Sequence, residues 1–188
     1  AWQDDVTMAR ELISLGANCN AKSTLGETPL HTAAKWNAKG VAAELLNSEA
    51  DVNAVTTRGQ SALMIGAGND MGPELCSALL RGGVDPVIPD ETGAVPIEIA
   101  VLNRSEELAT ILAAERDVNY RWGASGWSAL HCAVRLDRID LVKRFVAEGA
   151  DVNLRSARGH TPLYTAVSQG LDDIARYLRR HGAVMDVG

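Results

Sequence analysis

Apolar residues occur along this chain in short blocks with helical spacing. In one block, Leu141, Val142, Phe145 and Val146 follow the three- and four-residue steps of an amphipathic helix. Other blocks hold pairs of small residues, such as Ala33-Ala34, that let one helix lie close to another. Every apolar stretch is interrupted within a dozen residues by a charge, a glycine or a proline, so none is long enough to cross a membrane. The pattern predicts short helices joined by turns.

A four-residue pattern recurs five times at a nearly constant interval. It is found as Thr28-Pro29-Leu30-His31, Ser61-Ala62-Leu63-Met64, Val95-Pro96-Ile97-Glu98, Ser128-Ala129-Leu130-His131 and Thr161-Pro162-Leu163-Tyr164. A glycine precedes each pattern by two residues, and successive glycines are 33, 34, 33 and 33 residues apart. A second pattern, typified by Gly149-Ala150-Asp151-Val152-Asn153, recurs at the same interval. Two interlocked patterns with one period indicate a chain built of structural repeats.

Each four-residue pattern has the chemistry of a helix start. A hydroxyl at the first position can accept a hydrogen bond from the amides of the first turn, and proline at the second position lacks only an N–H that has no partner there. The hydroxyl is present at Thr28, Ser61, Ser128 and Thr161. Gly149 and its counterparts supply the left-handed residue that ends the second helix of a repeat. The Asp-Val-Asn segment that follows predicts an extended, hairpin-like finger.

The chain resembles the ankyrin-repeat family, whose pattern is G-x-T-P-L-H-x-A-A, then a second helix ending in L-L, then G-A-D-V-N. The resemblance covers essentially the whole chain, as one partial and five full units. It implies an all-α solenoid of stacked helix-turn-helix units with finger loops, in a single domain over residues 1–188. The expected units are approximately 1–22, 23–55, 56–89, 90–122, 123–155 and 156–188. Because one unit cannot bury its own apolar face, stability must come from stacking.

The third and fourth units, residues 56–89 and 90–122, depart from the repeat pattern. One residue is added between the helices at 69–73, Pro86 replaces the usual valine, Val95 removes a hydroxyl cap worth about 1 kcal/mol, and Glu98 replaces the motif histidine. We therefore expect residues 70–120 to be the softest part of the stack. The first unit lacks its first half, which predicts further sequence upstream. Arg179-Arg180 matches the charged outer surface of a terminal, capping repeat.

Composition and charge narrow the classes of partner. Apolar residues are 46% and charged residues 22% of the 188, as in folded globular proteins. The 18 basic and 24 acidic residues give a net charge of −6, which opposes general binding to nucleic acid. The three cysteines form no CxxC pair, so we expect a reducing, cytoplasmic or other intracellular compartment. We expect a monomer with no membrane insertion.

No residue pattern points to catalysis, a cofactor or a metal. The resemblance implies that His31 and His131, three periods apart, bridge backbone groups, while His160 and His181 have no ligand-like partner four residues on. Acidic pairs such as Asp172-Asp173 fall at the starts of outer helices, where they offset the helix dipole. No phosphate-binding glycine motif is present. We expect a non-enzymatic chain.

The resemblance implies a concave binding face lined by the fingers and inner helices. On the motif alignment, the predicted partner-binding residues are Lys35, Trp36, Arg58, Tyr120, Arg121, Trp122, Trp127, Arg135, Arg155 and Arg158. Three of the eight aromatic residues, at 120, 122 and 127, crowd one finger, and aromatic residues and arginine dominate binding hot spots. Alternatively, one of these tryptophans packs on the neighbouring finger and the longer loop adapts to the short fourth unit.

Charge distribution indicates the chemistry of the partner. Residues 1–94 carry a net charge of −6, whereas residues 95–188 are neutral overall. The arginines of the second half that fall on the concave side predict a basic, aromatic groove between about residues 120 and 160 that binds an acidic peptide or loop. A solvated charged face without a partner is the competing interpretation. The chain is expected to be a protein-interaction module, or else the targeting segment of a larger multidomain enzyme; its irregular units argue against an engineered binder.

Overall fold

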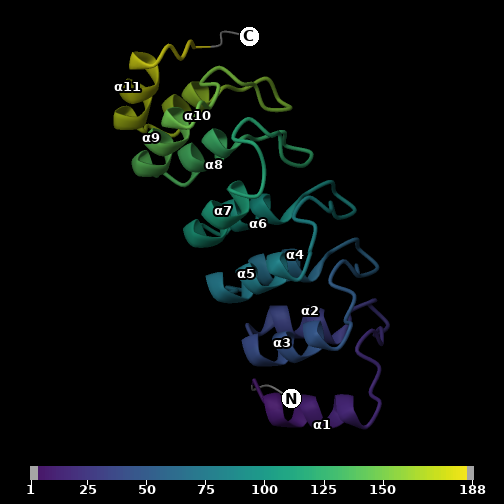
Figure 1. Cartoon of the computed structure of the whole chain (residues 1–188). Helices are drawn as coiled ribbons and strands as arrows, with labels where there is room; N and C mark the ends of the chain where they lie inside the picture. Colours follow the sequence, from purple (N-terminus) through teal and green to yellow (C-terminus); the bar gives the residue numbers. More distant parts are fainter. Residues whose placement is uncertain (1–3, 186–188) are drawn as a thin grey trace. The chain divides into compact units, whose positions relative to one another are not determined.

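The computed structural model describes residues 4–185 of the chain (Figure 1). These residues form helices and loops, with isolated bridges between Val55 and Ser61 and between Trp122 and Trp127 as their only β-type pairings. The helices are α1 (Val6–Ser14), α2 (Pro29–Lys35), α3 (Lys39–Asn47), α4 (Ala62–Ala67), α5 (Pro73–Arg81), α6 (Pro96–Leu102), α7 (Glu106–Ala113), α8 (Ala129–Arg135), α9 (Ile139–Ala147), α10 (Pro162–Ser168) and α11 (Asp172–Arg180). The predicted all-α repeat architecture is confirmed.

The chain divides into two compact units, residues 1–111 and 112–188, with the division inside α7. In the first unit, the inner helices α2, α4 and α6 pack in succession, as do the outer helices α1, α3 and α5. In the second unit, α8 packs against α9 and α10, and α10 packs against α11. The prediction of one domain stays a prediction, and its limits at residues 1 and 188 lie outside the described residues.

The motif side chains form the apolar interior of each repeat. The third motif position is almost completely buried in all five repeats, at Leu30, Leu63, Ile97, Leu130 and Leu163. The residue added between α4 and α5 also contributes, because Met71 is buried and its sulfur would lie 2.5 Å from any Cβ placed on Gly66. The small residue at position 66 therefore makes room for the longer connection.

The predicted helix starts are present, with one substitution. The hydroxyl oxygens of Ser61 and Thr161 accept hydrogen bonds from amides three residues later, both at 3.2 Å. At Val95, where no hydroxyl exists, the buried carboxylate of Glu98 accepts the Val95 N–H at 2.9 Å. This bond takes the place of the one that the motif histidine accepts from Thr28 N and Ser128 N. The hydroxyl acceptor itself is absent at Val95, as expected from the sequence.

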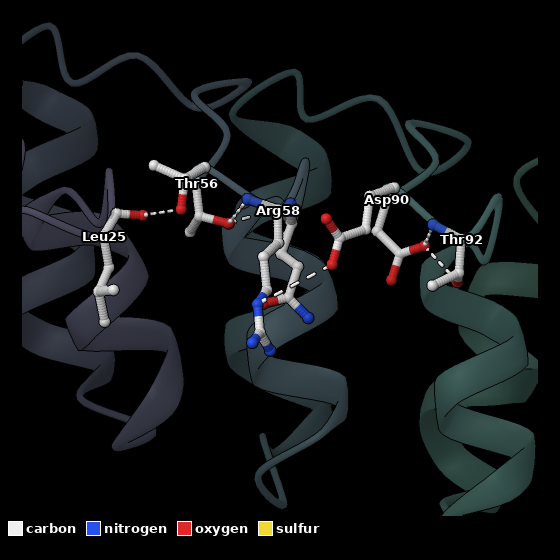
Figure 2. Close-up of polar contacts among 8 residues, drawn as sticks. Leu25, Thr56, Arg58, Asp90 and Thr92 are labelled. Atoms are coloured by element: carbon white, nitrogen blue, oxygen red, sulfur yellow. Dashed lines mark hydrogen bonds and ion pairs between the residues drawn. The ribbon is translucent and has the colours of Figure 1, made fainter.

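Neighbouring fingers are joined by backbone hydrogen bonds. In the first unit, Thr57 N donates to Leu25 O at 3.0 Å and Glu91 N donates to Arg58 O at 2.9 Å. Figure 2 shows these fingers side by side, with the Thr56 and Asp90 side chains beside the turns that they stabilise. In the second unit, the equivalent bond runs from Ala157 N to Ser125 O at 2.8 Å. These bonds set the spacing of the side chains that project from the finger tips.

A repeated asparagine forms a second connection between consecutive repeats. Asn119 donates from its amide nitrogen to Gly149 O at 3.2 Å and accepts from Asp151 N at 2.7 Å. The same pair of bonds is made by Asn20, Asn53 and Asn153. At this register the second full repeat, residues 56–89, has Val87, whose side chain can neither donate nor accept. The sequence irregularity therefore removes a polar side chain that the other units use for stacking.

Candidate protein-interaction surface

In the first unit, the fingers and inner helices enclose a polar hollow of about 280 Å³. Its lining includes Glu27, Lys35, Gln60 and Met64 from two successive repeats. Lys35 is exposed at the end of α2, as the sequence predicted. Arg58 is exposed on the next finger, where its Nε lies 3.9 Å from a carboxylate oxygen of Glu91. The structure therefore places both predicted basic residues of this unit at its surface.

Trp36 faces a different hollow from its neighbour Lys35. It lines an apolar cavity of about 340 Å³ together with Leu12 and Ile13 of α1 and Val41 and Leu45 of α3. The Trp36 side chain is 51% exposed. The counterpart of Trp36 two repeats later is Asn103, whose side-chain nitrogen donates to Ala67 O of the preceding repeat at 3.2 Å. Both side chains at this motif position therefore point toward the preceding repeat. Trp36 and Lys35 line different hollows because consecutive residues at a helix end diverge, and the role of Trp36 as a partner contact stays a prediction.

Trp122 is an internal residue of its finger. Its side chain is completely buried, its backbone N–H donates to Trp127 O at 2.7 Å, and the Tyr120 ring meets it edge-on at 5.1 Å between centroids. The prediction of Trp122 as a partner contact is therefore wrong, and the alternative that one tryptophan packs within the array is correct. Trp122 stands where the other fingers have a hydroxyl or carboxylate, such as Ser156 or Asp90, so burial replaces polar bonding there.

The hydroxyl displaced by Trp122 reappears later in the same finger. The Ser125 hydroxyl accepts the Trp127 N–H at 3.2 Å, a bond that Thr56 makes to Gln60 N in the first unit. Because the loop is one residue longer, Trp122 can be buried in the finger while Ser125 still supplies the hydroxyl that accepts a turn amide. Tyr120 remains at the surface, 37% exposed, and the Arg116 guanidinium lies 5.9 Å from its ring centroid.

Arg135 and Trp127 form the most ordered part of the predicted basic groove. Arg135 is the last residue of α8, and its guanidinium carbon lies 4.2 Å from the centroid of the half-buried Trp127 ring. The Arg135 Nε is buried without a hydrogen-bond partner among the described residues. Arg121 is exposed and its terminal nitrogen lies 3.1 Å from the Cβ position of Gly126, beside Trp127. The structure therefore places Arg135, at the end of α8, beside the finger that carries Arg121 and Trp127.

Arg155 and Arg158 extend the basic surface to the next finger. Both are exposed, and the ion pairs formed among the described residues include neither Arg121, Arg135 nor Arg158. On the same repeat, the His160 ring stacks on Tyr164 at 4.2 Å between centroids. This part of the second unit thus presents cations and aromatic rings with little compensating acidic charge.

His31 and His131 hold repeats together, as the resemblance implied. Nδ1 of His131 accepts the Ser128 N–H at 3.2 Å, which places the proton on Nε2 and lets it donate to His160 O at 3.0 Å. His31 does the same between Thr28 N and Gln60 O. Burial lowers the pKa of both rings, because the charged form would lose its hydration. These neutral rings stabilise the stack and position the finger that carries His160.

The described residues contain no group of histidine, cysteine or acidic side chains that could hold a metal ion. Cys76 and Cys132 are buried and Cys19 is partly buried, and no disulfide joins them. None of the helices in the described part is both long and apolar enough to span a bilayer.

Stacked helix pairs with hydrogen-bonded fingers define a repeat protein that presents a surface. The model of the family described as ankyrin repeats (3 copies) matches residues 1–90, 63–156 and 97–187. The chain belongs to the ankyrin-repeat family. A crystal structure of the ankyrin-repeat domain of Bcl-3, a member of the IkappaB protein family, superposes with a TM-score of 0.76 at 26% identity, covering 95% of this chain and 80% of that one.

Relatives in sequence include parts of much larger proteins. The nuclear factor NF-kappa-B p105 subunit of Gallus gallus is 31% identical over 171 residues, which is 87% of this chain and 17% of that protein. The mitochondrial disaggregase of Bos taurus is 33% identical over 155 residues, 80% of this chain and 23% of that protein. The chain thus spans less than a quarter of the length of these two relatives. Family membership supports a role as a protein-interaction module.

Proposed function

We propose that this chain binds an acidic segment of another protein through the surface of its fingers and inner helices, without catalysis of its own. The observation that carries the proposal is a group of three arginines. Arg121 and Arg158 are exposed on two hydrogen-bonded fingers, Arg135 is half-buried at the end of α8, and none of the three has an acidic partner among the described residues. Arginine forms two parallel bonds to a carboxylate, so such a group favours acidic ligands. Trp127 and Tyr120 supply adjacent aromatic area.

In the first unit, Lys35 lines the 280 Å³ hollow with Glu27 and Gln60, a mixture that suits polar contacts better than a strongly acidic ligand. We therefore assign the acidic preference to the second unit, and we propose Lys35 and Arg58 as contacts of the first unit by itself. The three cysteines, which form no CxxC pair, support our further proposal of a reducing compartment.

Selection of peptides from a random display library on the intact chain tests this function. We expect the selected peptides to be rich in Asp and Glu, and to bind an Arg121→Ala, Arg135→Ala, Arg158→Ala variant at least tenfold more weakly. The matched control is Lys143→Ala, Arg179→Ala, Arg180→Ala, which removes the same charge from exposed positions on α9 and α11. Equal loss of binding in both variants, or peptides without acidic residues, would contradict the proposal.

A second candidate is supported by the lengths of the relatives. Because the mitochondrial disaggregase carries its similar region in 23% of its length, a chain of this kind can be one segment of a larger protein. We propose, as the alternative, that the segment recruits substrates or targets for an enzyme encoded in the same reading frame. Sequencing of the full transcript decides: an enzyme domain in the same frame supports this alternative, and a frame holding repeats alone opposes it.

A further inference from the structure

Arg135 differs from Arg121 and Arg158 in being held in place. Its guanidinium carbon lies over the Trp127 ring, 4.2 Å from the centroid, and the side chain is half-buried, whereas Arg121 and Arg158 are exposed. A stacked guanidinium keeps its edge, which carries the N–H groups, free to form hydrogen bonds in the plane of the group. A fixed arginine loses less side-chain freedom on binding than a mobile one.

The hydrogen-bonding capacity of Arg135 is unused by the described residues. None of the hydrogen bonds or ion pairs in this part of the chain involves its guanidinium, and its Nε has no partner although it is buried. Because the Nε has no accessible surface, an oxygen acceptor from a ligand would meet the terminal N–H groups of the guanidinium, and partial burial strengthens such a bond. Beside a guanidinium, a negatively charged acceptor is favoured.

The surroundings of Arg135 favour an anion. Arg121 approaches the turn at Gly126, next to Trp127, so a second positive charge lies on the same finger. Trp127 itself is fixed on both sides, because its N–H donates to Ser125 and its carbonyl accepts from Trp122 N. The Trp122 backbone thus helps to hold in place the residue on which the Arg135 guanidinium rests.

We propose that the Arg135–Trp127 pair is the receptor for a single carboxylate, the side chain of an Asp or Glu in the bound segment. The inference rests on the proposed function and narrows it to one recognition site. The carboxylate accepts hydrogen bonds from the guanidinium edge while Trp127 covers the face of the group. Arg121 adds long-range attraction, and Arg155 and Arg158 contact other parts of the segment.

The test uses sodium propionate, a mimic of the glutamate side chain, titrated into the ¹⁵N-labelled intact chain. Arginine Nε–H and tryptophan indole N–H signals are followed by NMR at constant ionic strength, with sodium chloride as the reference. We expect the Arg135 Nε–H and Trp127 indole signals to shift and saturate, with an affinity at least tenfold tighter than any response at Arg155 or Arg158. A linear response equal at all these arginines would overturn the assignment.

Two further arms make the test specific. Arg135→Lys keeps the charge but loses the flat fork, so we expect propionate to bind at least tenfold more weakly while the Trp122 indole signal, which reports the finger fold, stays in place. Inorganic phosphate distinguishes the class of anion, and tighter binding of phosphate than of propionate would overturn the choice of a carboxylate. Saturating propionate binding with failed peptide selection would reject the proposed function alone; the reverse result would reject this site alone.

Discussion

The glycine of the finger turn offers a direct measurement of how much finger contacts contribute to stability. Gly126 and Gly159 occupy the same motif position in the second unit, and both have positive φ, +60° and +81°. A Cβ on Gly126 would lie 2.9 Å from Ala157 N, a backbone atom of the next finger. A Cβ on Gly159 would meet no described atom within 4 Å. Alanine at the two sites therefore separates conformational strain from the clash between fingers.

Conformational strain applies to both substitutions and costs about 1–2 kcal/mol for a non-glycine residue in the left-handed region. It should be no greater at Gly126, whose φ lies closer to the left-handed minimum. Gly126→Ala must in addition displace the next finger and weaken the 2.8 Å bond from Ala157 N to Ser125 O, which adds about 0.5–1.5 kcal/mol. We expect Gly126→Ala to be the more destabilising by about 1 kcal/mol.

Urea unfolding of both variants, followed by far-UV circular dichroism, measures the free energies of unfolding. Hydrogen exchange at the Ala157 amide provides the local readout, and we expect it to accelerate in Gly126→Ala and to stay unchanged in Gly159→Ala. Equal destabilisation by the two substitutions, with Ala157 still protected, would refute the view that finger-to-finger contact stabilises the array.

Three other properties can be predicted from the repeat contacts. Because burial holds the folded pKa of His31 and His131 below their unfolded value of about 6.5, the unfolded chain binds more protons under acid conditions. We therefore expect the free energy of unfolding, measured by urea denaturation at a series of pH values, to fall as pH drops below about 6.5. A His31→Gln, His131→Gln variant should be less stable at pH 7.5, and its free energy of unfolding should depend less on pH. Asn119→Ala removes two bonds to the next repeat and should cost about 1–2 kcal/mol in urea denaturation, whereas Asn119→Asp, which keeps the acceptor for Asp151 N, should cost less; equal costs would be evidence against a contribution from the bond that Asp151 N donates. Hydrogen exchange should be faster over residues 70–120 than over 130–178, since Val87 and Glu98 replace the asparagine and histidine used elsewhere, and equal protection would contradict this expectation.

The sequence predicted the role of a residue well where the same residue type recurs at the same position of each repeat and has only one structural role there. The Thr or Ser helix caps and the bridging histidines could be assigned because each repeats with the period of the fold and has a local partner within three residues. The asparagine of the Asp-Val-Asn segment had the same periodicity, at Asn20, Asn53, Asn119 and Asn153, but its partners lie about 30 residues away. Its role therefore becomes clear only when the stacking distance between repeats is known.

The candidate surface was harder to predict, because motif position fixes a residue's place on a repeat and leaves its burial open. Trp122 and Trp127 lie five residues apart on one finger, yet one is enclosed and the other supports an arginine at the surface. The difference follows from the extra loop residue, which moves the turn hydroxyl from position 122 to Ser125. The cavity that Trp36 lines could not be predicted for a related reason, since it depends on how α1 packs on α3.

The most direct test of where this chain binds is a hydrogen-exchange footprint of the intact protein with one of its selected acidic peptides. We predict that the peptide slows exchange in the fingers of the second unit, at residues 120–128 and 154–161, and at the end of α8. Slower exchange confined to the outer helices α9 and α11, with the fingers unaffected, would contradict the account.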